Sequence, residues 1–250
     1  MTSAQRSDIL TSHRAILEYL NSAQGGATLF VANEGRRTDE MIQLARQRGI
    51  AIERVSRQRL IQLGGERARD LILRIQLENR HSHSVREILR DLDDPSALVL
   101  LLDHVTDPHN FGAILRSADQ FGADAVIVPS HGSSPVSAVV METSAGTATH
   151  VRIVTVPNLS AAIRELKDHD FWVYAAEMSG HSVLETDMSG RVALVLGSEG
   201  AGVSRLVSEK VDLGISIPIR GHADSLNVSV ACGILLYEIR RQQKLSLIHI

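Results

Sequence analysis

Residues able to do chemistry gather in three loops of the second half of the chain, and each loop follows an apolar run. In the first, a run that begins at residue 97 ends at Asp103, and a helix is predicted to start near Asn110. Asn110 could cap that helix, whose N-terminus favours anions. Arg116 lies six residues further on, so it is predicted on another face of the helix. Alone, a cap and a surface arginine would explain this loop.

The second loop joins the apolar run VALVL to the sequence GSEGAG, which begins at Gly197. Three glycines in six residues indicate a tight backbone or a ligand that approaches the main chain closely. Glu199 is the charged residue of this loop. The spacing differs from G-x-G-x-x-G, so it gives no support for a nicotinamide-dependent oxidoreductase.

The third loop follows a strand pattern that ends at Ile217-Pro218-Ile219, and it leads into the sequence Ser225-Leu226-Asn227. A long amphipathic helix is predicted to begin there, with Ser225 or Asn227 as its cap. Capping accounts for one of these polar residues but not for the whole cluster.

Buried strands and helices in alternation are predicted to position these loops. From residue 97 onward, continuous apolar runs of the kind made by strands buried on both faces alternate with helical patterns. This indicates a mainly parallel sheet with helices on both faces. In the last helix, apolar residues recur at helical spacing and suit either core packing or a subunit interface: Val228, Ala231, Leu235 and Ile239.

The N-terminal part is predicted to be a separate, small α/β module. Residues 7–23 are predicted as a helix, followed by strand and helix patterns to about residue 65. Residues 66–96 are charged and poor in apolar runs. The predicted division is a small domain over 1–70, a linker over 71–96 and a larger domain over 97–250.

Charge is distributed unevenly along the 250 residues. Residues 1–80 hold 13 basic and 9 acidic side chains, a net charge of +4, whereas the whole chain carries −3. All 13 basic residues are arginines, whose planar fork suits phosphate. A general preference of this sequence for arginine is an equal explanation, since the whole chain has three lysines.

Several classes of function are disfavoured. The lone Cys232 allows no internal disulfide and stands in an apolar helical stretch, which predicts an inert core thiol. The 11 histidines show no metal-ligand spacing, so no metal site is expected. No apolar run is long enough to span a bilayer and no signal peptide is recognisable, so a cytoplasmic protein without membrane contact is expected. Aromatic residues, at 3%, are too few for a single-strand stacking platform, which favours recognition of folded RNA.

The three loops together resemble the three motifs of the SpoU/TrmH family of RNA ribose methyltransferases. The matches are Asn110-x-Gly112-x-x-x-Arg116, Leu196-Gly197-Ser198-Glu199-Gly200-x-Gly202, and Ile217-Pro218-Ile219 with Ser225-Leu226-Asn227-Val228-Ser229. They occur in the family's order, and the resemblance covers residues 97–243. Residues 1–70 more loosely resemble the RNA-binding domain of members that act on large-subunit ribosomal RNA. The His-Gln-Gly element usual near their linker is absent, and Ala68-Arg69-Asp70 stands nearby instead.

The resemblance implies a sheet whose C-terminal segment forms a trefoil knot, with S-adenosylmethionine as methyl donor and no metal. It implies cofactor contacts at Gly197, Ile217 and Leu226. It further implies catalytic roles for a second set of residues: Arg116, Asn110, Glu199, Ser225 and Asn227. Because a guanidinium stays protonated, Arg116 is better suited to bind phosphate and stabilise a developing alkoxide than to act as a base.

The resemblance also implies a homodimer with the active site near the subunit interface, and structured RNA as substrate. The expected target is a guanosine of large-subunit (23S) rRNA, because the N-terminal module is unusual in transfer-RNA members. Two alternatives stay open: a transfer-RNA ribose 2′-O-methyltransferase, and a non-catalytic RNA-binding protein on the same fold.

Overall fold

The computed structural model describes residues 7–22, 26–66, 68–76, 84–222 and 225–243. The chain divides into two compact units. Unit 1 contains residues 1–80 together with 135–150, and unit 2 contains residues 81–134 and 151–250. The three loops singled out in the sequence all belong to unit 2.

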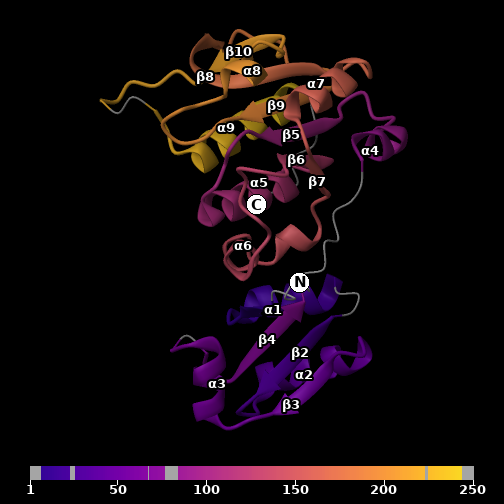
Figure 1. Ribbon diagram of the computed structural model, residues 1–250, viewed down its shortest axis with the longest axis vertical. Coiled ribbons are helices and arrows are strands. Elements are labelled where there is room, and N and C mark those ends of the chain that lie inside the picture. The colour runs from indigo at the N-terminus through magenta and orange to yellow at the C-terminus, as the bar shows by residue number, and fades with distance from the viewer. Residues whose placement is uncertain (1–6, 23–25, 67, 77–83, 223–224, 244–250) are drawn as a thin grey trace. The chain divides into compact units, whose positions relative to one another are not determined.

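Unit 1 is built on a four-stranded mixed sheet in the order β1-β4-β2-β3 (Figure 1). Strands β2 and β3 are parallel, and β4 runs antiparallel to both β1 and β2. Its elements are β1 (Ser7–Leu10), α1 (His13–Ser22), β2 (Ala27–Val31), α2 (Arg36–Gln47), β3 (Ala51–Arg54), α3 (Arg57–Gly64), β4 (Leu71–Gln76), α6 (Ala138–Thr143) and the 3₁₀ helix η1 (Thr147–Thr149).

The structure corrects two predictions at the ends of this sheet. Residues Ser7–Leu10 form β1 and not the start of a helix, because they pair with β4 from Ser7↔Gln76 to Leu10↔Leu73. Residues Leu71–Gln76, predicted to open a linker, form β4 between β1 and β2. The predicted linker also contains α4 (Val85–Asp91), so much of its length is regular structure.

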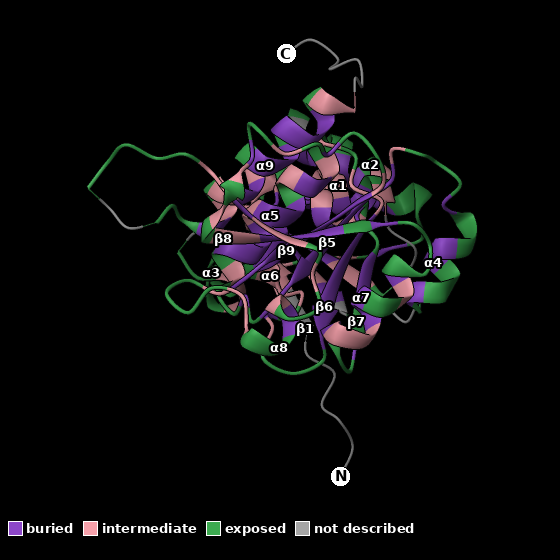
Figure 2. Cartoon of the chain, turned by 90° about the horizontal axis from the view of Figure 1, so that it is seen from above, coloured by how far each residue is buried: buried purple, intermediate pink, exposed green. Residues whose placement is uncertain are grey.

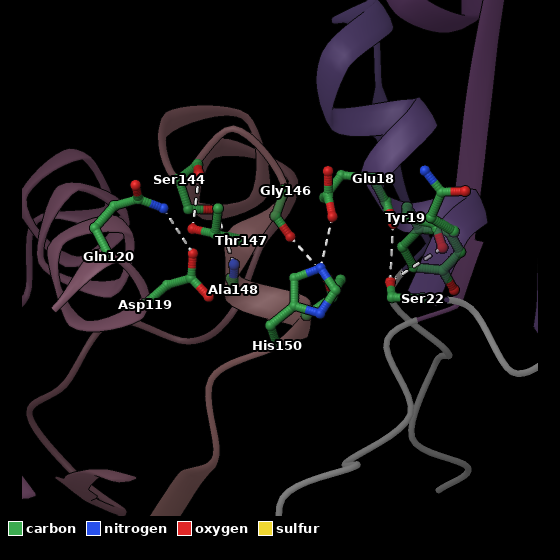
Figure 3. Close-up of polar contacts among 12 residues, drawn as sticks. Glu18, Tyr19, Ser22, Asp119, Gln120, Ser144, Gly146, Thr147, Ala148 and His150 are labelled. Carbon is green, nitrogen blue, oxygen red and sulfur yellow. Dashed lines mark hydrogen bonds and ion pairs between the residues drawn. The ribbon is translucent and has the colours of Figure 1, made fainter. Parts of the chain in front are cut away.

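Within unit 1, residues 135–150 pack on α1. The Glu142 Oε1 atom accepts hydrogen bonds from the Thr11 backbone N–H and hydroxyl, both at 2.7 Å, and from the Ser12 N–H at 3.2 Å. These bonds satisfy the N–H groups of the two residues directly before α1, which begins at His13. Figure 3 shows a second link, in which His150 Nε2 lies 2.6 Å from Glu18 Oε1. Gly146, at φ 87°, approaches Glu18 so closely that a Cβ there would lie 2.4 Å from the Glu18 Cβ.

Unit 2 is built on a six-stranded sheet in the order β10-β8-β9-β5-β6-β7, with every neighbouring pair parallel (Figure 1). Its strands are β5 (Leu98–Leu102), β6 (Ala125–Pro129), β7 (Ile153–Val156), β8 (Trp172–Ser182), β9 (Val192–Leu196) and β10 (Leu213–Ser216). Every residue of β5 and β9 is buried, as expected for strands covered on both faces.

Helices cover both faces of this sheet, as predicted, and Figure 2 shows the buried strands between them. Alternate residues of β5 and β9 pack in one cluster with α4, α7 (Leu159–Lys167) and α8 (Arg205–Ser208). The opposite face carries α5 (Pro108–Gln120) and α9 (Val228–Gln242), which pack on each other and on β6 and β9. The apolar stripe of α9 faces this core, since Val228, Leu235 and Ile239 are buried.

The strand order decides where a ligand can bind. From β5 the chain moves outward through β6 to β7, and then returns to the other side of β5 with β8, β9 and β10. Open parallel sheets bind ligands beyond the carboxyl ends of the strands at such a reversal. The first and second loops follow β5 and β9, which are adjacent, so the topology brings them together.

Arg240, near the end of α9, fastens this helix to the rest of unit 2. Its side chain is buried and donates hydrogen bonds to the backbone carbonyls of Phe121 at 2.7 Å, Ser96 at 2.8 Å and Gly122. Burial lowers the pKa of its guanidinium. The three carbonyl oxygens replace the hydrogen bonds to water that the buried guanidinium has lost.

We expect Arg240→Met to lower the free energy of unfolding by about 3 kcal/mol, because it leaves buried carbonyls without donors. For a chain of this size the melting temperature should fall by roughly 6–12 °C, measured by thermal unfolding. The control is Arg164→Met on the exposed surface of α7, which should change stability by less than about 0.5 kcal/mol. Equal melting temperatures for the two variants would contradict this role.

Candidate active site

The loop after β9 is a tight turn that only glycine permits at its first position. A Cβ on Gly197 would lie 2.0 Å from the carbonyl carbon of Gly202. The turn is closed by two backbone hydrogen bonds, from Ser198 N–H to the Gly202 carbonyl at 3.1 Å and from Gly202 N–H to the Ser198 carbonyl at 2.9 Å. Gly202 and Gly200 have φ of 69° and 87°, a region that favours glycine. The glycines predicted to shape this loop therefore do so, by close contact between two backbone segments.

Asp103, which was not among the predicted site residues, stabilises the loop after β9 through its carboxylate. Its side chain is buried, and its Oδ2 accepts a hydrogen bond from the Ser204 backbone N–H at 2.7 Å. Its Oδ1 lies 2.6 Å from His104 Nδ1, and its own N–H donates to the Leu196 carbonyl at 2.8 Å. The signal was available in the sequence, because Asp103 is a charged residue placed directly after an unbroken apolar strand.

Three polar side chains from three separate segments lie together beyond the carboxyl ends of β5 and β9. Asn110 Nδ2 donates to Glu199 Oε1 at 3.1 Å, and Asn227 Nδ2 donates to the same oxygen at 2.5 Å. Asn227 Nδ2 also donates to Asn110 Oδ1 at 2.9 Å. Glu199 Oε2 has no hydrogen-bond partner among the residues that the structure describes. Side-chain hydrogen bonds thus join the three loops that were predicted to act together. The two partners of Asn110 lie 89 and 117 residues away from it in sequence.

Helix beginnings supply two of these three residues. Asn227 is the N-cap of α9, as predicted: its Oδ1 accepts from the N–H groups of Ser229 at 2.9 Å and Val230 at 3.3 Å. Asn110 is not a cap. Asp107 caps α5 through a bond from the His109 N–H at 3.0 Å, so Asn110 lies inside the first turn and is buried. Its amide is therefore free to face Glu199 and Asn227.

Arg116 and Ser225 are not drawn into this network. Arg116 is exposed on α5, on a different face of the helix from the buried Asn110, as the spacing predicted. Neither Arg116 nor Ser225 has a hydrogen-bond or ion-pair partner within the described part of the chain. A guanidinium and a hydroxyl without protein partners are available to bind a ligand, whereas Asn110 and Asn227 are already engaged.

Apolar side chains lie in the loop that leads from β10 to Asn227. Ile217 is half-buried, and Leu226 is 37% exposed. Ile219 is 45% exposed. These side chains offer apolar surface in the same loop as the polar network, a combination typical of small-molecule sites.

Three further features bear on a reactive cysteine, a metal site and a membrane-spanning helix. Burial raises the pKa of the Cys232 thiol to about 12, so this cysteine is a protonated core residue as predicted. Among the described residues, no three histidine, cysteine, aspartate or glutamate side chains are grouped to hold a metal ion. No helix in the described ranges has both the length and the apolar character to cross a membrane.

Known proteins resemble this chain over most of its length. The 23S rRNA (guanosine-2′-O-)-methyltransferase RlmB of Coxiella burnetii is 38% identical over 213 residues, which cover 84% of this chain and 85% of that protein. The protein of the same name from Xanthomonas campestris pv. campestris is 42% identical over 212 residues, covering 83% and 84%. The crystal structure of an AdoMet-bound rRNA methyltransferase from Sinorhizobium meliloti superposes with a TM-score of 0.79 at 26% identity, covering 96% of this chain and 89% of that one.

Family descriptions match both parts of the chain. Residues 13–70 match the RNA 2′-O ribose methyltransferase substrate binding domain. Residues 97–237, which contain the glycine loop and the network of Asn110, Glu199 and Asn227, match the SpoU rRNA Methylase family. This chain is a member of the SpoU rRNA methylase family.

Proposed function

We propose that this protein transfers a methyl group from S-adenosylmethionine to a ribose 2′-hydroxyl of RNA, and that its substrate is a guanosine of large-subunit (23S) rRNA. The observation that carries the proposal is the network of Asn110, Glu199 and Asn227. It joins the three motifs of the family at the carboxyl ends of adjacent strands. The names of the relatives, 23S rRNA guanosine-2′-O-methyltransferases, support the choice of substrate.

The residues around the network fit the methyl donor. Leu226 and Ile217 offer apolar side chains suited to an adenine ring. Gly200 and Gly202 have open space where a Cβ would project, which lets a ligand approach the backbone. When bound, the donor would supply an electrophilic methyl group on a sulfonium: the sulfur leaves as a neutral thioether as the methyl bonds to the 2′-oxygen, and the hydroxyl proton would be lost to solvent. In this proposal Gly197 keeps the turn closed while Ile217 and Leu226 hold the adenine.

Arg116 has the central part in the proposed reaction. Its exposed guanidinium, which has no partner among the described residues, binds an RNA phosphate next to the reacting ribose and stabilises the negative charge that develops on the 2′-oxygen. Ser225, which also lacks a partner among the described residues, orients the ribose. Asn110 and Asn227 fix the position of Glu199, and the carboxylate orients the donor or the ribose through Oε2.

The N-terminal module is proposed to bind the RNA. Several of its arginines are exposed in the structure: Arg36, Arg46, Arg54, Arg57 and Arg59. Each can contact phosphate, and such contacts raise affinity without reading sequence. The module would therefore hold a structured RNA while unit 2 does the chemistry. A cytoplasmic location, where this RNA is made, and the trefoil knot of the family both stay predictions.

The substrate is tested by methyl transfer from labelled S-adenosylmethionine to total ribosomal RNA and total transfer RNA, each from cells that lack this gene. We expect label in large-subunit rRNA. Label in transfer RNA alone would keep the chemistry and overturn the substrate. Binding of the donor without transfer to either RNA would favour the non-catalytic alternative.

A homodimer is proposed to form through the outer face of α9. The stripe that we predicted for this helix faces the core of unit 2, but a second stripe is exposed. Val230, Ile234 and Tyr237 recur at helical spacing and are 51%, 40% and 47% exposed. This stripe begins one turn after Asn227, so pairing along it would place the active site near the interface.

We expect wild-type protein to have twice the chain mass in solution and Ile234→Glu to be a monomer, because the variant buries a charge in the contact. Light scattering at micromolar concentration measures both. The matched control is Leu206→Glu on α8, where Leu206 is 66% exposed, and this variant should remain a dimer. A monomeric wild-type protein would contradict the proposal.

A further inference from the structure

A pocket of about 610 Å³ lies away from the active-site network. It is lined by residues near the start of β8, by His181 near the end of that strand, by the first residues of β9 and β10, and by the loop that joins β8 to β9. Trp172 is the first residue of β8. Val192 is the first residue of β9, whose opposite end leads into the glycine loop, so the pocket and the active-site network lie at opposite ends of this strand. None of the eight residues predicted for catalysis or donor binding lines this pocket, so methyl transfer as proposed leaves it unused.

One wall of the pocket is fixed by α9. Gln242 accepts a hydrogen bond from the Met188 N–H at 2.7 Å and donates to the Thr186 carbonyl at 3.1 Å. Gln243 donates to the Gly190 carbonyl at 2.7 Å. Three side-chain bonds thus hold a five-residue stretch of the loop in place. The pocket is therefore preorganised, which favours binding by lowering the entropy lost on association.

The polar groups inside the pocket fall into two sets. The Tyr174 hydroxyl donates to the Asp187 carbonyl at 2.8 Å, and Arg191 donates to the Leu92 carbonyl at 2.6 Å while its guanidinium stacks over the Phe171 ring. The Tyr174 hydroxyl is thus engaged within the protein, whereas the buried Nε of Arg191 has no hydrogen-bond partner among the described residues.

The second set faces solvent. Trp172, the one tryptophan of the chain, is 60% exposed. The carboxylates of Glu185 and Asp187 are exposed. Hydrogen bonds from the Ser189 hydroxyl and N–H lower the pKa of Asp187, which keeps it ionised at neutral pH. The pocket thus offers an aromatic face beside hydrogen-bond acceptors.

This combination selects a particular ligand chemistry. An exposed indole stacks on a planar base. Carboxylates accept N–H donors and repel phosphate. Among the bases, guanine presents two adjacent donors, N1–H and the exocyclic amine, on its Watson–Crick edge, and one carboxylate can accept both. We propose that this pocket binds an unpaired guanine of the substrate RNA, stacked on Trp172 and held by Glu185 or Asp187. This inference rests on the proposed function insofar as the ligand is RNA.

Trp172 reports on its own site, because its emission is the tryptophan emission of the whole chain. The experiment titrates full-length protein with two RNA hairpins of identical stem, one with guanines and one with uridines in the loop, and with free guanosine. We expect quenching by the guanine hairpin and, at higher concentration, by guanosine. Equal quenching by both hairpins would overturn the assignment to guanine. If Trp172 emission changed with protein concentration but not with added RNA, the pocket would be a contact surface between two chains, and the proposal would be overturned.

Variants separate this pocket from the catalytic site. These variants lack the reporting tryptophan, so their binding is measured by the anisotropy of a fluorophore attached to the hairpin. Trp172→Ala should weaken binding of the guanine hairpin about 10-fold, and Trp172→Phe should restore most of it. With ribosomal RNA, Trp172→Ala should raise KM and leave kcat unchanged. The control is Met178→Ala, since Met178 is 74% exposed on β8 outside the pocket. Unchanged binding by Trp172→Ala would overturn the proposal. If the wild-type protein methylates no RNA but the guanine hairpin still quenches Trp172, the proposed function fails and this pocket stands.

Discussion

Arg116→Ala is expected to abolish methyl transfer while leaving donor binding intact. The guanidinium is the exposed cation of the first motif, and it has no partner among the described residues. Its removal leaves the developing charge on the 2′-oxygen without a donor. Loss of one such donor typically costs about 10²- to 10³-fold in kcat. Single-turnover transfer of labelled methyl measures the chemical step, and calorimetry measures donor affinity, which should stay within about 2-fold.

Two comparisons make this result specific. Arg116→Lys keeps the charge but loses the planar fork, so it should recover only part of the rate. Arg205→Ala removes another exposed arginine of unit 2, on α8, where Arg205 pairs with Glu209, and it should keep full activity. Near-normal turnover by Arg116→Ala would exclude the role proposed here.

Gly197→Ala should have the second-largest effect, and through a different cause. The added Cβ would lie 2.0 Å from the carbonyl carbon of Gly202, and backbone cannot move aside as a flexible side chain can. The turn must open, which displaces Glu199 from Asn110 and Asn227. We expect donor affinity to fall at least about 10-fold and the free energy of unfolding to fall by about 3 kcal/mol.

Donor binding by calorimetry and thermal unfolding measure these two effects. The control is Gly190→Ala, because a Cβ at Gly190 would meet nothing within 4 Å. It should unfold at the wild-type temperature and bind the donor normally. If Gly197→Ala bound the donor as tightly as the wild-type protein, the closed turn would not be needed for the site.

Much of unit 2 could be predicted from the sequence because its signals are local. Runs such as Leu98–Leu102 and Val192–Leu196 are unbroken and apolar, and they become fully buried strands. Asn227 precedes a clear helical pattern and caps it. The same reasoning misplaced Asn110, because Asp107 followed by Pro108 is a stronger helix start. That error has a functional meaning, since a residue inside the turn can reach Glu199.

The errors in unit 1 have a different origin. Ser7–Leu10 fits a helical pattern locally, but its partner strand is β4, and the paired residues are 63 to 69 positions apart in sequence. Leu71–Gln76 was assigned to a charged linker because charged residues flank it on both sides. Pairing with distant strands decides both cases, and no local pattern contains that information. Asp103 could have been recognised as a charged residue directly after a buried strand, but its contact with Ser204 could not be predicted, because Ser204 belongs to another loop.

The proposed reaction methylates a ribose 2′-oxygen. The most direct measurement is alkaline hydrolysis of large-subunit RNA that the protein has labelled from S-adenosylmethionine. A methylated 2′-oxygen blocks cleavage at its own phosphodiester. We expect the label in alkali-resistant dinucleotides that begin with guanosine. Label recovered in mononucleotides would place the methyl group on a base and exclude ribose methylation.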